Sequence, residues 1–145
     1  MIRLVLVEDN PQTLAALSKL FSTAEDFSLV GAHESAELAL LETNWREVDV
    51  LLTDLELPGL TGSQLIAVAR GQAPELLALA HTMHENRVDL FAALRAGASG
   101  YLVKGTGGMD VIQSIHAMHQ GETPISPAVA RHLVAYFHAA EQSQP

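Results

Sequence analysis

The sequence predicts an α/β fold in which helices cover both faces of an open parallel sheet. Five short apolar runs, each bounded by polar residues or glycine, have the pattern of strands that are buried on both faces. Segments with helical spacing lie between the runs, so strand and helix alternate five times. The chain has 145 residues, enough for one such domain and a short extension. The runs are residues 2–7, 29–32, 48–52, 76–80 and 101–103.

The first predicted helix begins after Asn10, a good N-cap, and Pro11 suits its first turn. Apolar residues then recur at steps of three and four, which places one stripe on the helix. The stripe consists of Leu14, Leu17, Leu20 and Phe21.

The other four helices of the sheet are marked by caps and glycines. Ser35 can cap the second helix, which carries Leu38 and Leu41. The third, fourth and fifth helices span about residues 62–70, 86–96 and 109–120. Each is followed by a glycine, the residue that most often ends a helix in the left-handed conformation. These glycines are Gly71, Gly97 and Gly121.

The C-terminal segment predicts one additional helix. Ser126 is its expected N-cap, Pro127 fits the first turn, and the helix should run to about Ala140. Residues 141–145 should be frayed.

Composition restricts the class of protein. The net charge is −9 with only eight lysines and arginines, so the chain is a poor DNA binder by itself. No apolar run approaches the roughly 18 residues of a membrane span, so none is expected. The N-terminal apolar run is too short, and too soon followed by acids, to suggest a secretory signal. The chain has no cysteine, which is compatible with the cytoplasmic location that we expect.

Polar side chains collect where the predicted strands end. Glu8 and Asp9 follow the first strand, Asp54 the third, Thr82 the fourth and Lys104 the fifth. Ligands of parallel sheets bind at this edge. Three carboxylates there repel one another unless a cation is present, and oxygen ligands suit Mg²⁺. A carboxylate can attack a phosphoryl group while a metal and a lysine offset the charge, so the pattern indicates phosphoryl transfer.

Four segments resemble the response-regulator receiver family, and most closely its NarL/FixJ branch of LuxR-type regulators. They are residues 5–9 (VLVED), 54–62 (DLELPGLTG), 82–84 (TMH) and 97–104 (GASGYLVK). The match keeps its order and spacing from about residue 2 to residue 121. The resemblance implies a flavodoxin-like (CheY-like) doubly wound parallel sheet of five strands in the order 2-1-3-4-5. Residues 1–121 would be the receiver domain, and residues 122–145 a C-terminal linker helix and tail.

The resemblance also implies a metal site and a phosphoacceptor. Asp54 would accept the phosphoryl group from a phosphohistidine of a sensor histidine kinase. Asp9, Asp54 and the backbone carbonyl of Glu56 would bind Mg²⁺, and Glu8 would contribute indirectly. Apart from self-phosphorylation with small donors, and self-dephosphorylation, the domain would not be an enzyme.

The same resemblance assigns the switch. Lys104 would pair with the phosphate, Thr82 would supply a hydroxyl that moves inward, and Tyr101 would fill the vacated space. The surface of the last strand–helix units would then change shape and favour a homodimer. Small residues enrich that surface, namely Ala92, Ala93, Ala96 and Ala98.

Two departures from the family pattern concern the loops of the active state. His81 stands before Thr82, where the family usually has an apolar residue. Residues 105–108 (GTGG) form a loose segment after Lys104, without a following proline. Neither departure removes a reacting group.

Plainer roles exist for the same residues. Glu8, Asp9 and Asp54 can cap helices, Thr82 and Lys104 can be ordinary surface residues, and Tyr101 can simply pack in a strand. The pairs His116 with His119 and His81 with His84 lack the motif context of a metal site, although His84 could tune a pH response.

The leading functional hypothesis is a receiver that controls a C-terminal DNA-binding output in a transcription regulator. In that case DNA is contacted only through an output domain that this chain does not contain, and a membrane is not involved. A free-standing receiver that acts by protein contact is the alternative.

An aspartate-nucleophile phosphohydrolase is a rival, but it would need a D-x-D motif on the first strand, whereas residues 54–56 read DLE on the third. A degenerate receiver that never takes phosphate is a further possibility, which the complete acidic set argues against.

Overall fold

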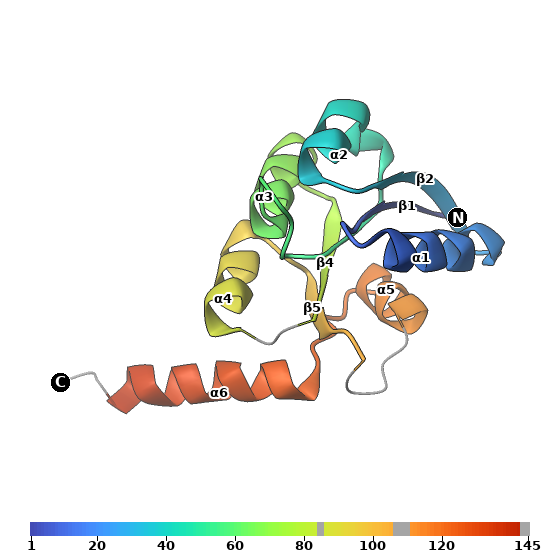
Figure 1. The fold of residues 1–145 in the computed structure, drawn as a ribbon. Helices are drawn as coiled ribbons and strands as arrows, with labels where there is room; N and C mark the ends of the chain where they lie inside the picture. The colour runs from blue at the N-terminus through green and yellow to red at the C-terminus, as the bar shows by residue number, and fades with distance from the viewer. Residues whose placement is uncertain (84–85, 106–110, 143–145) are drawn as a thin grey trace.

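The computed structural model describes residues 1–83, 86–105 and 111–142 and contains a parallel sheet with helices on both faces (Figure 1). The spatial order β2-β1-β3-β4-β5 reverses direction between β1 and β3, as in a doubly wound sheet. The predicted fold class, strand order and extra C-terminal helix are therefore confirmed. The strands are β1 (Ile2–Val7), β2 (Phe27–His33), β3 (Val50–Thr53), β4 (Leu77–Thr82) and β5 (Gly100–Val103).

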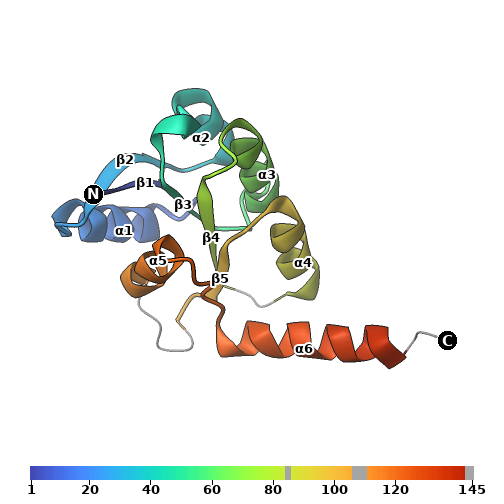
Figure 2. The ribbon, with the colours of Figure 1, turned by 180° about the vertical axis from the view of Figure 1, so that it is seen from behind.

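Alternate residues of β1, β3, β4 and β5 pack into two separate hydrophobic cores, one on each face of the sheet. In β1, Leu4 and Leu6 face one core, and Val5 and Val7 face the other. The first core lies under α1 (Pro11–Thr23) and α5 (Val111–His119). The second lies under α2 (Ala36–Glu42), α3 (Gly62–Gln72) and α4 (Arg87–Ala96), on the opposite side of the sheet (Figure 2).

Most helix ends follow their predicted signals. The side chain of Asn10 accepts hydrogen bonds from the amides of Gln12 and Thr13, each at 3.0 Å. Ser35 caps α2 in the same way through the amide of Leu38. Gly97 ends α4 with a φ of 106°, a left-handed conformation that is unfavourable for residues other than glycine. The predicted start of α5 at Met109 lies outside the described residues.

Several strand and helix boundaries differ from the predicted ones, among them the end of α3 and the start of β3. Helix α3 continues through Gly71 to Gln72 and ends at Ala73, because Pro74 disfavours the helical conformation in the residue before it. Strand β3 begins at Val50, not Val48. The preceding residues form the short 3₁₀ helix η1 (Trp45–Glu47), whose last turn closes when the amide of Val48 donates to the carbonyl of Trp45 at 3.1 Å.

Several leucines and valines do not face the core as the helical stripes suggested. Alanines face the sheet at several of these positions, where they let a helix backbone approach it closely. In α2 the buried residues are Ala36 and Ala39, and in α4 they are Leu90 and Ala93. Ala93 is therefore not available to a partner surface. The exposed residues of the predicted stripes are Leu20, Leu38, Leu41 and Val88.

The C-terminal helix α6 (Pro127–Gln142) is joined to the sheet edge. The amide of Tyr101 donates to the carbonyl of Pro124 at 2.9 Å, and the amide of Ser126 donates to the carbonyl of Tyr101 at 3.1 Å. The Ser126 carbonyl accepts from the amide of Ala130, so Ser126 occupies the predicted N-cap position. Val129 is completely buried in the second core. Among the described residues, no helix combines the length and the apolar character that a membrane crossing needs.

Candidate functional site

The ends of β1 and β3 bring the first carboxylates together. These strands are neighbours, with Val7 paired to Thr53, so the residues that follow them meet at one edge of the sheet. The amide of Asp54 donates to the carbonyl of Val7 at 3.0 Å. The backbone thus fixes Asp54 beside Glu8 before any side-chain contact is considered.

Glu8, Asp9 and Asp54 form an acidic cluster. One oxygen from each carboxylate can be chosen so that all three lie within 4.8 Å of one another. Only 3% of Glu8 and 7% of Asp54 are exposed, whereas Asp9 is exposed. The three carboxylates therefore gather at one edge of the sheet, as the strand-end pattern predicted, and two of them are buried while Asp9 is exposed.

Lys104 bridges the two buried carboxylates. Its Nζ atom donates to Asp54 Oδ2 at 2.9 Å and also pairs with Glu8 Oε1. Burial by itself lowers the pKa of Lys104, but the hydrogen bonds to Glu8 and Asp54 outweigh it and raise the pKa above its ordinary value. Lys104 is therefore an ammonium at neutral pH and offsets part of the negative charge of the cluster.

Backbone amides occupy the remaining oxygens of the buried carboxylates. Asp54 Oδ1 accepts from the amide of Glu56 at 3.0 Å, and Glu8 Oε2 accepts from the amide of Asn10 at 3.2 Å. Burial nevertheless raises the pKa of Glu8, and the nearby charge of Asp54 adds to the increase, against the opposing effect of Lys104 and Asn10. Glu8 is thus more easily protonated than an ordinary glutamate, a cost that a bound cation would remove.

The loop after Asp54 is held close to the site by α3 and α2. Any Cβ atom on Gly62, the first residue of α3, would collide with the carbonyl oxygen of Asp54. The amide of Leu60 donates to Glu37 Oε2 on α2 at 3.1 Å. Sequence reasoning missed Glu37, and no local pattern could have revealed a contact across 23 positions.

Thr82 and Tyr101 lie on the strands next to the cluster. Thr82 is buried at the end of β4, and its carbonyl accepts the amide of Lys104 at 2.6 Å. Tyr101 is completely buried in the second core, together with Val103 and Ala80. Their burial is compatible with the switch roles expected from the resemblance, which stay predictions.

His81 remains neutral near the charged cluster. Burial is the main reason that its pKa falls to about 4, and the positive charge of Lys104 lowers it further against the attraction of Asp54. His84 and residues 106–108 of the glycine-rich segment lie outside the described residues.

The donor set fits a hard divalent cation. All three side-chain ligands are carboxylates, which Mg²⁺ prefers over nitrogen or sulfur, and the exposed position of Asp9 leaves room for water ligands. The single ammonium of Lys104 cannot balance three carboxylates, so the cluster has an excess of negative charge. Both features support a metal site.

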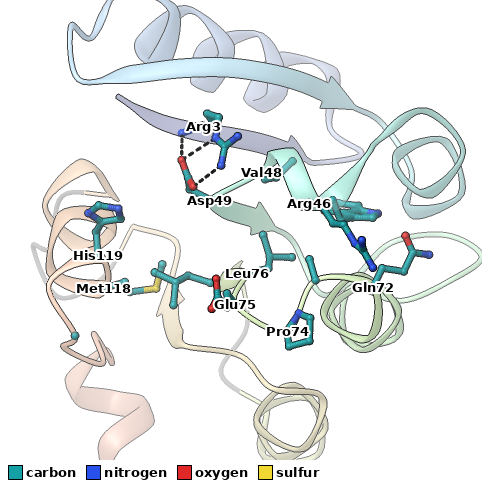
Figure 3. Close-up of a pocket in the computed structure, with 14 residues that line it drawn as sticks. Arg3, Arg46, Val48, Asp49, Gln72, Pro74, Glu75, Leu76, Met118 and His119 are labelled. Carbon is teal, nitrogen blue, oxygen red and sulfur yellow. Dashed lines mark hydrogen bonds and ion pairs between the residues drawn. The ribbon is translucent and has the colours of Figure 1, made fainter.

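A separate pocket of about 720 Å³ lies at the other edge of the sheet, where β1, β3 and β4 begin (Figure 3). Its charged groups include Arg3 and Asp49, which pair with each other at 3.0 Å. The hydrogen bond from Arg3 is also the main reason that the pKa of Asp49 is lowered. None of the carboxylates of the acidic cluster lines this pocket.

Comparison with protein families identifies a family to which most of the chain is similar. The model of the response regulator receiver domain matches residues 4–116. Among curated proteins, the response regulator GacA of Pseudomonas protegens is 31% identical over 134 residues, covering 92% of this chain and 63% of GacA. The nitrate/nitrite response regulator protein NarL of Escherichia coli is 26% identical over 136 residues, covering 94% of this chain and 63% of NarL. This chain thus spans less than two thirds of these relatives.

Solved structures give the same result. A LuxR-family response regulator from Aurantimonas has a TM-score of 0.83 at 27% identity, covering 92% of this chain and 96% of that one. The isolated receiver domain of RcsB from Salmonella enterica, solved with the phosphomimetic beryllofluoride, has a TM-score of 0.79 at 25% identity, covering 90% and 97%. A structure of RcsB dimers bound to DNA has a TM-score of 0.80 at 25% identity, covering 91% and 67%.

Proposed function

Because this chain belongs to the response regulator receiver domain family, we propose that Asp54 accepts a phosphoryl group from a sensor histidine kinase. The phosphorylated domain then controls an output through protein contacts. The observation that carries the proposal is the buried Asp54 carboxylate, which lies 2.9 Å from the Lys104 ammonium and beside Glu8 and Asp9. This arrangement supplies a nucleophile, a fixed positive charge and carboxylates for a cation.

The chemistry is a displacement at phosphorus. A carboxylate oxygen of Asp54 attacks, the new O–P bond forms, and the N–P bond of the phosphohistidine breaks; the departing imidazole nitrogen keeps the electron pair and takes a proton. Lys104 leaves Glu8 and stays close to the oxygens of the transferred group. Asp9, Asp54 and the carbonyl of Glu56, with Glu8 acting indirectly, would hold Mg²⁺, and the ion would offset negative charge on those oxygens.

The phosphorylated state is read out by Thr82 and Tyr101. Phosphoryl oxygens offer the Thr82 hydroxyl an acceptor that it reaches by moving inward, and Tyr101 follows into the space that this movement opens. The surface of α4, β5 and α5 then changes and two copies of the chain associate. Thr82 is buried at the end of β4 and Tyr101 is buried in the second core, which supports this sequence of events.

The output is transcription regulation in a longer protein. RcsB, one of the structural relatives, binds DNA as dimers, and the curated relatives are longer than this chain. Because the net charge of this chain is −9, we expect contact with DNA to be made by an output domain and not by the receiver. The proposal includes a cytoplasmic location, with which the absence of cysteine is compatible.

Incubation with acetyl phosphate and Mg²⁺, followed by intact-mass analysis, tests the proposal. We expect one phosphoryl adduct in the wild-type chain and none in Asp54→Asn, which keeps the size of the side chain but is a poor nucleophile. An adduct in both proteins would contradict the assignment. Steady hydrolysis of a phosphomonoester without an adduct would instead favour the phosphohydrolase.

A further inference from the structure

The segment before α6 extends the sheet beyond β5. Ile125 forms a parallel bridge with Tyr101, flanked by the two backbone hydrogen bonds of Tyr101 to Pro124 and Ser126. A third hydrogen bond involves a side chain, because the hydroxyl of Ser126 accepts from the amide of Val103 at 3.1 Å. Ser126 is only 2% exposed, so this hydroxyl is committed to β5.

Helix α6 also packs against α4. The ring of Tyr136 lies on that of Phe91, with 4.6 Å between the ring centroids. Two apolar residues of α6 pack into the second hydrophobic core: Val129, which is completely buried, and Leu133, which is partly buried. Both ribbon views show α6 leaving the sheet beside β5 and passing α4 (Figures 1 and 2). The helix therefore covers part of the α4–β5 surface.

The consecutive residues Val103 and Lys104 at the end of β5 connect the attachment of α6 to the proposed phosphorylation site. Val103, whose amide binds Ser126, directly precedes Lys104, and the amide of Lys104 is bonded to the carbonyl of Thr82. Lys104 pairs with Glu8 through an oxygen that belongs to the acidic cluster. Lys104 must therefore change its hydrogen-bond partners when the cluster binds a cation and a phosphoryl group. This change takes place at the end of β5, next to the residue whose amide is bonded to Ser126.

We propose that α6 is an autoinhibitory clamp on the α4–β5 surface, held by the Ser126–Val103 bond and the Tyr136–Phe91 contact. The clamp is closed in the unphosphorylated domain and opens when Asp54 carries a phosphoryl group. Opening exposes Phe91, Val129 and Leu133 to a partner. This inference rests on the proposed phosphorylation of Asp54 and adds the regulation of that site.

Linkage gives the clamp a measurable consequence. If phosphoryl binding opens the clamp, then weakening the clamp must strengthen phosphoryl binding by the same factor. Tyr136→Ala removes the contact with Phe91 from a side chain that is 46% exposed, so the variant leaves the core intact. The matched control is Val134→Ala on the same helix, whose side chain is 55% exposed.

The test uses beryllofluoride with Mg²⁺ as the phosphoryl mimic, with calorimetry for affinity and hydrogen exchange for the amides of α6. We expect the mimic to accelerate exchange in α6 of the wild-type chain. Tyr136→Ala should bind the mimic more tightly, by up to about tenfold given the strength of one aromatic pair, and Val134→Ala should bind like wild type. That combination supports the clamp.

Two results overturn the proposal in different ways. If the mimic binds but α6 exchange stays constant or slows, or if Tyr136→Ala binds like Val134→Ala, the clamp is wrong and the phosphoacceptor assignment stands. If wild type and both variants fail to bind the mimic, the proposed function fails and the clamp fails with it.

Discussion

Lys104 takes the position of a counterion between two carboxylates that have little access to water. Removing charge from water is costly, and a partner that is close and hydrogen-bonded offsets the cost. In this structure the partner of Glu8 and Asp54 is the ammonium, and Asp9 at the mouth remains unbalanced. An excess of negative charge therefore remains at the site, which favours the binding of a cation.

Replacing this lysine tests the charge balance. Lys104→Met should lower the free energy of unfolding by about 2–4 kcal/mol at neutral pH, because two buried carboxylates lose their cation. Mg²⁺ should restore part of the loss by binding only the folded state. Urea denaturation in chelator and in Mg²⁺ measures both effects. Lys19→Met, which changes an exposed lysine of α1, is the control, and equal stability of the two variants would refute the role.

His81 makes a pH-dependent contribution to stability. Its pKa is about 4 in the folded chain and about 6.5 when unperturbed, so the unfolded state binds the proton more readily. Stability is therefore present above the unfolded pKa and is lost as pH falls toward the folded pKa. Between about pH 7.5 and about pH 5 the loss should be about 2 kcal/mol.

The variant His81→Leu should lack this loss, whereas His138→Leu on the exposed side of α6 should keep it. Urea denaturation at the two pH values measures the difference. A pH dependence that is the same in His81→Leu and in wild type would show that His81 is not the responsible group.

Single residues at strand ends were the most predictable part of the site. Parallel strands end at one edge whatever the helices do, so the positions of Glu8, Asp54 and Lys104 follow from the strand assignment alone. Their pairing does not follow. The sequence predicted only that Lys104 pairs with the phosphoryl group, whereas the structure shows Lys104 paired with Glu8 and Asp54. These side-chain pairs could not be predicted because they depend on burial and on distances in the folded chain.

At the scale of elements, the entry of α3 sets the shape of the Asp54 loop. Gly62→Ala should lower the free energy of unfolding by about 1–3 kcal/mol and slow phosphorylation, since the added methyl group collides with the Asp54 carbonyl. Gly71→Ala in the same helix meets open space and should raise stability by about 0.5–1 kcal/mol. Urea denaturation and adduct formation compare the two; similar behaviour of the variants would contradict this account of Gly62.

Caps and breaks were predictable where the signal is local, as the Asn10, Ser35 and Gly97 contacts demonstrate. The end of α3 was wrongly predicted at Gly71, because a glycine inside a helix is tolerated. The helix ends just before Pro74, which disfavours the helical conformation in the residue that precedes it. The short η1 helix was also missed, although its hydrogen bonds are local. The attachment of α6 to β5 was missed because it depends on contacts between residues far apart in the chain.

For the whole molecule, self-association is the expected consequence of phosphorylation. Thr82→Ala should still accept a phosphoryl group on Asp54 but associate more weakly, since the switch hydroxyl that senses the group is gone. Sedimentation analysis in beryllofluoride and Mg²⁺ measures the association, and intact-mass analysis measures the adduct. Thr61→Ala, which changes the N-cap of α3, is the control for loss of a hydroxyl. Wild-type association in Thr82→Ala would rule out this relay.

The most direct test of the central claim is the amount of phosphoryl adduct formed from acetyl phosphate by the wild-type chain in Mg²⁺ and in chelator. The claim is that a cation held by Asp9, Asp54 and the Glu56 carbonyl, with Glu8 acting indirectly, permits attack by the buried Asp54 carboxylate. It predicts one adduct per chain, mapped to the peptide with Asp54, in Mg²⁺ and almost none in chelator. Equal adduct in both conditions, or an adduct on another peptide, would contradict it.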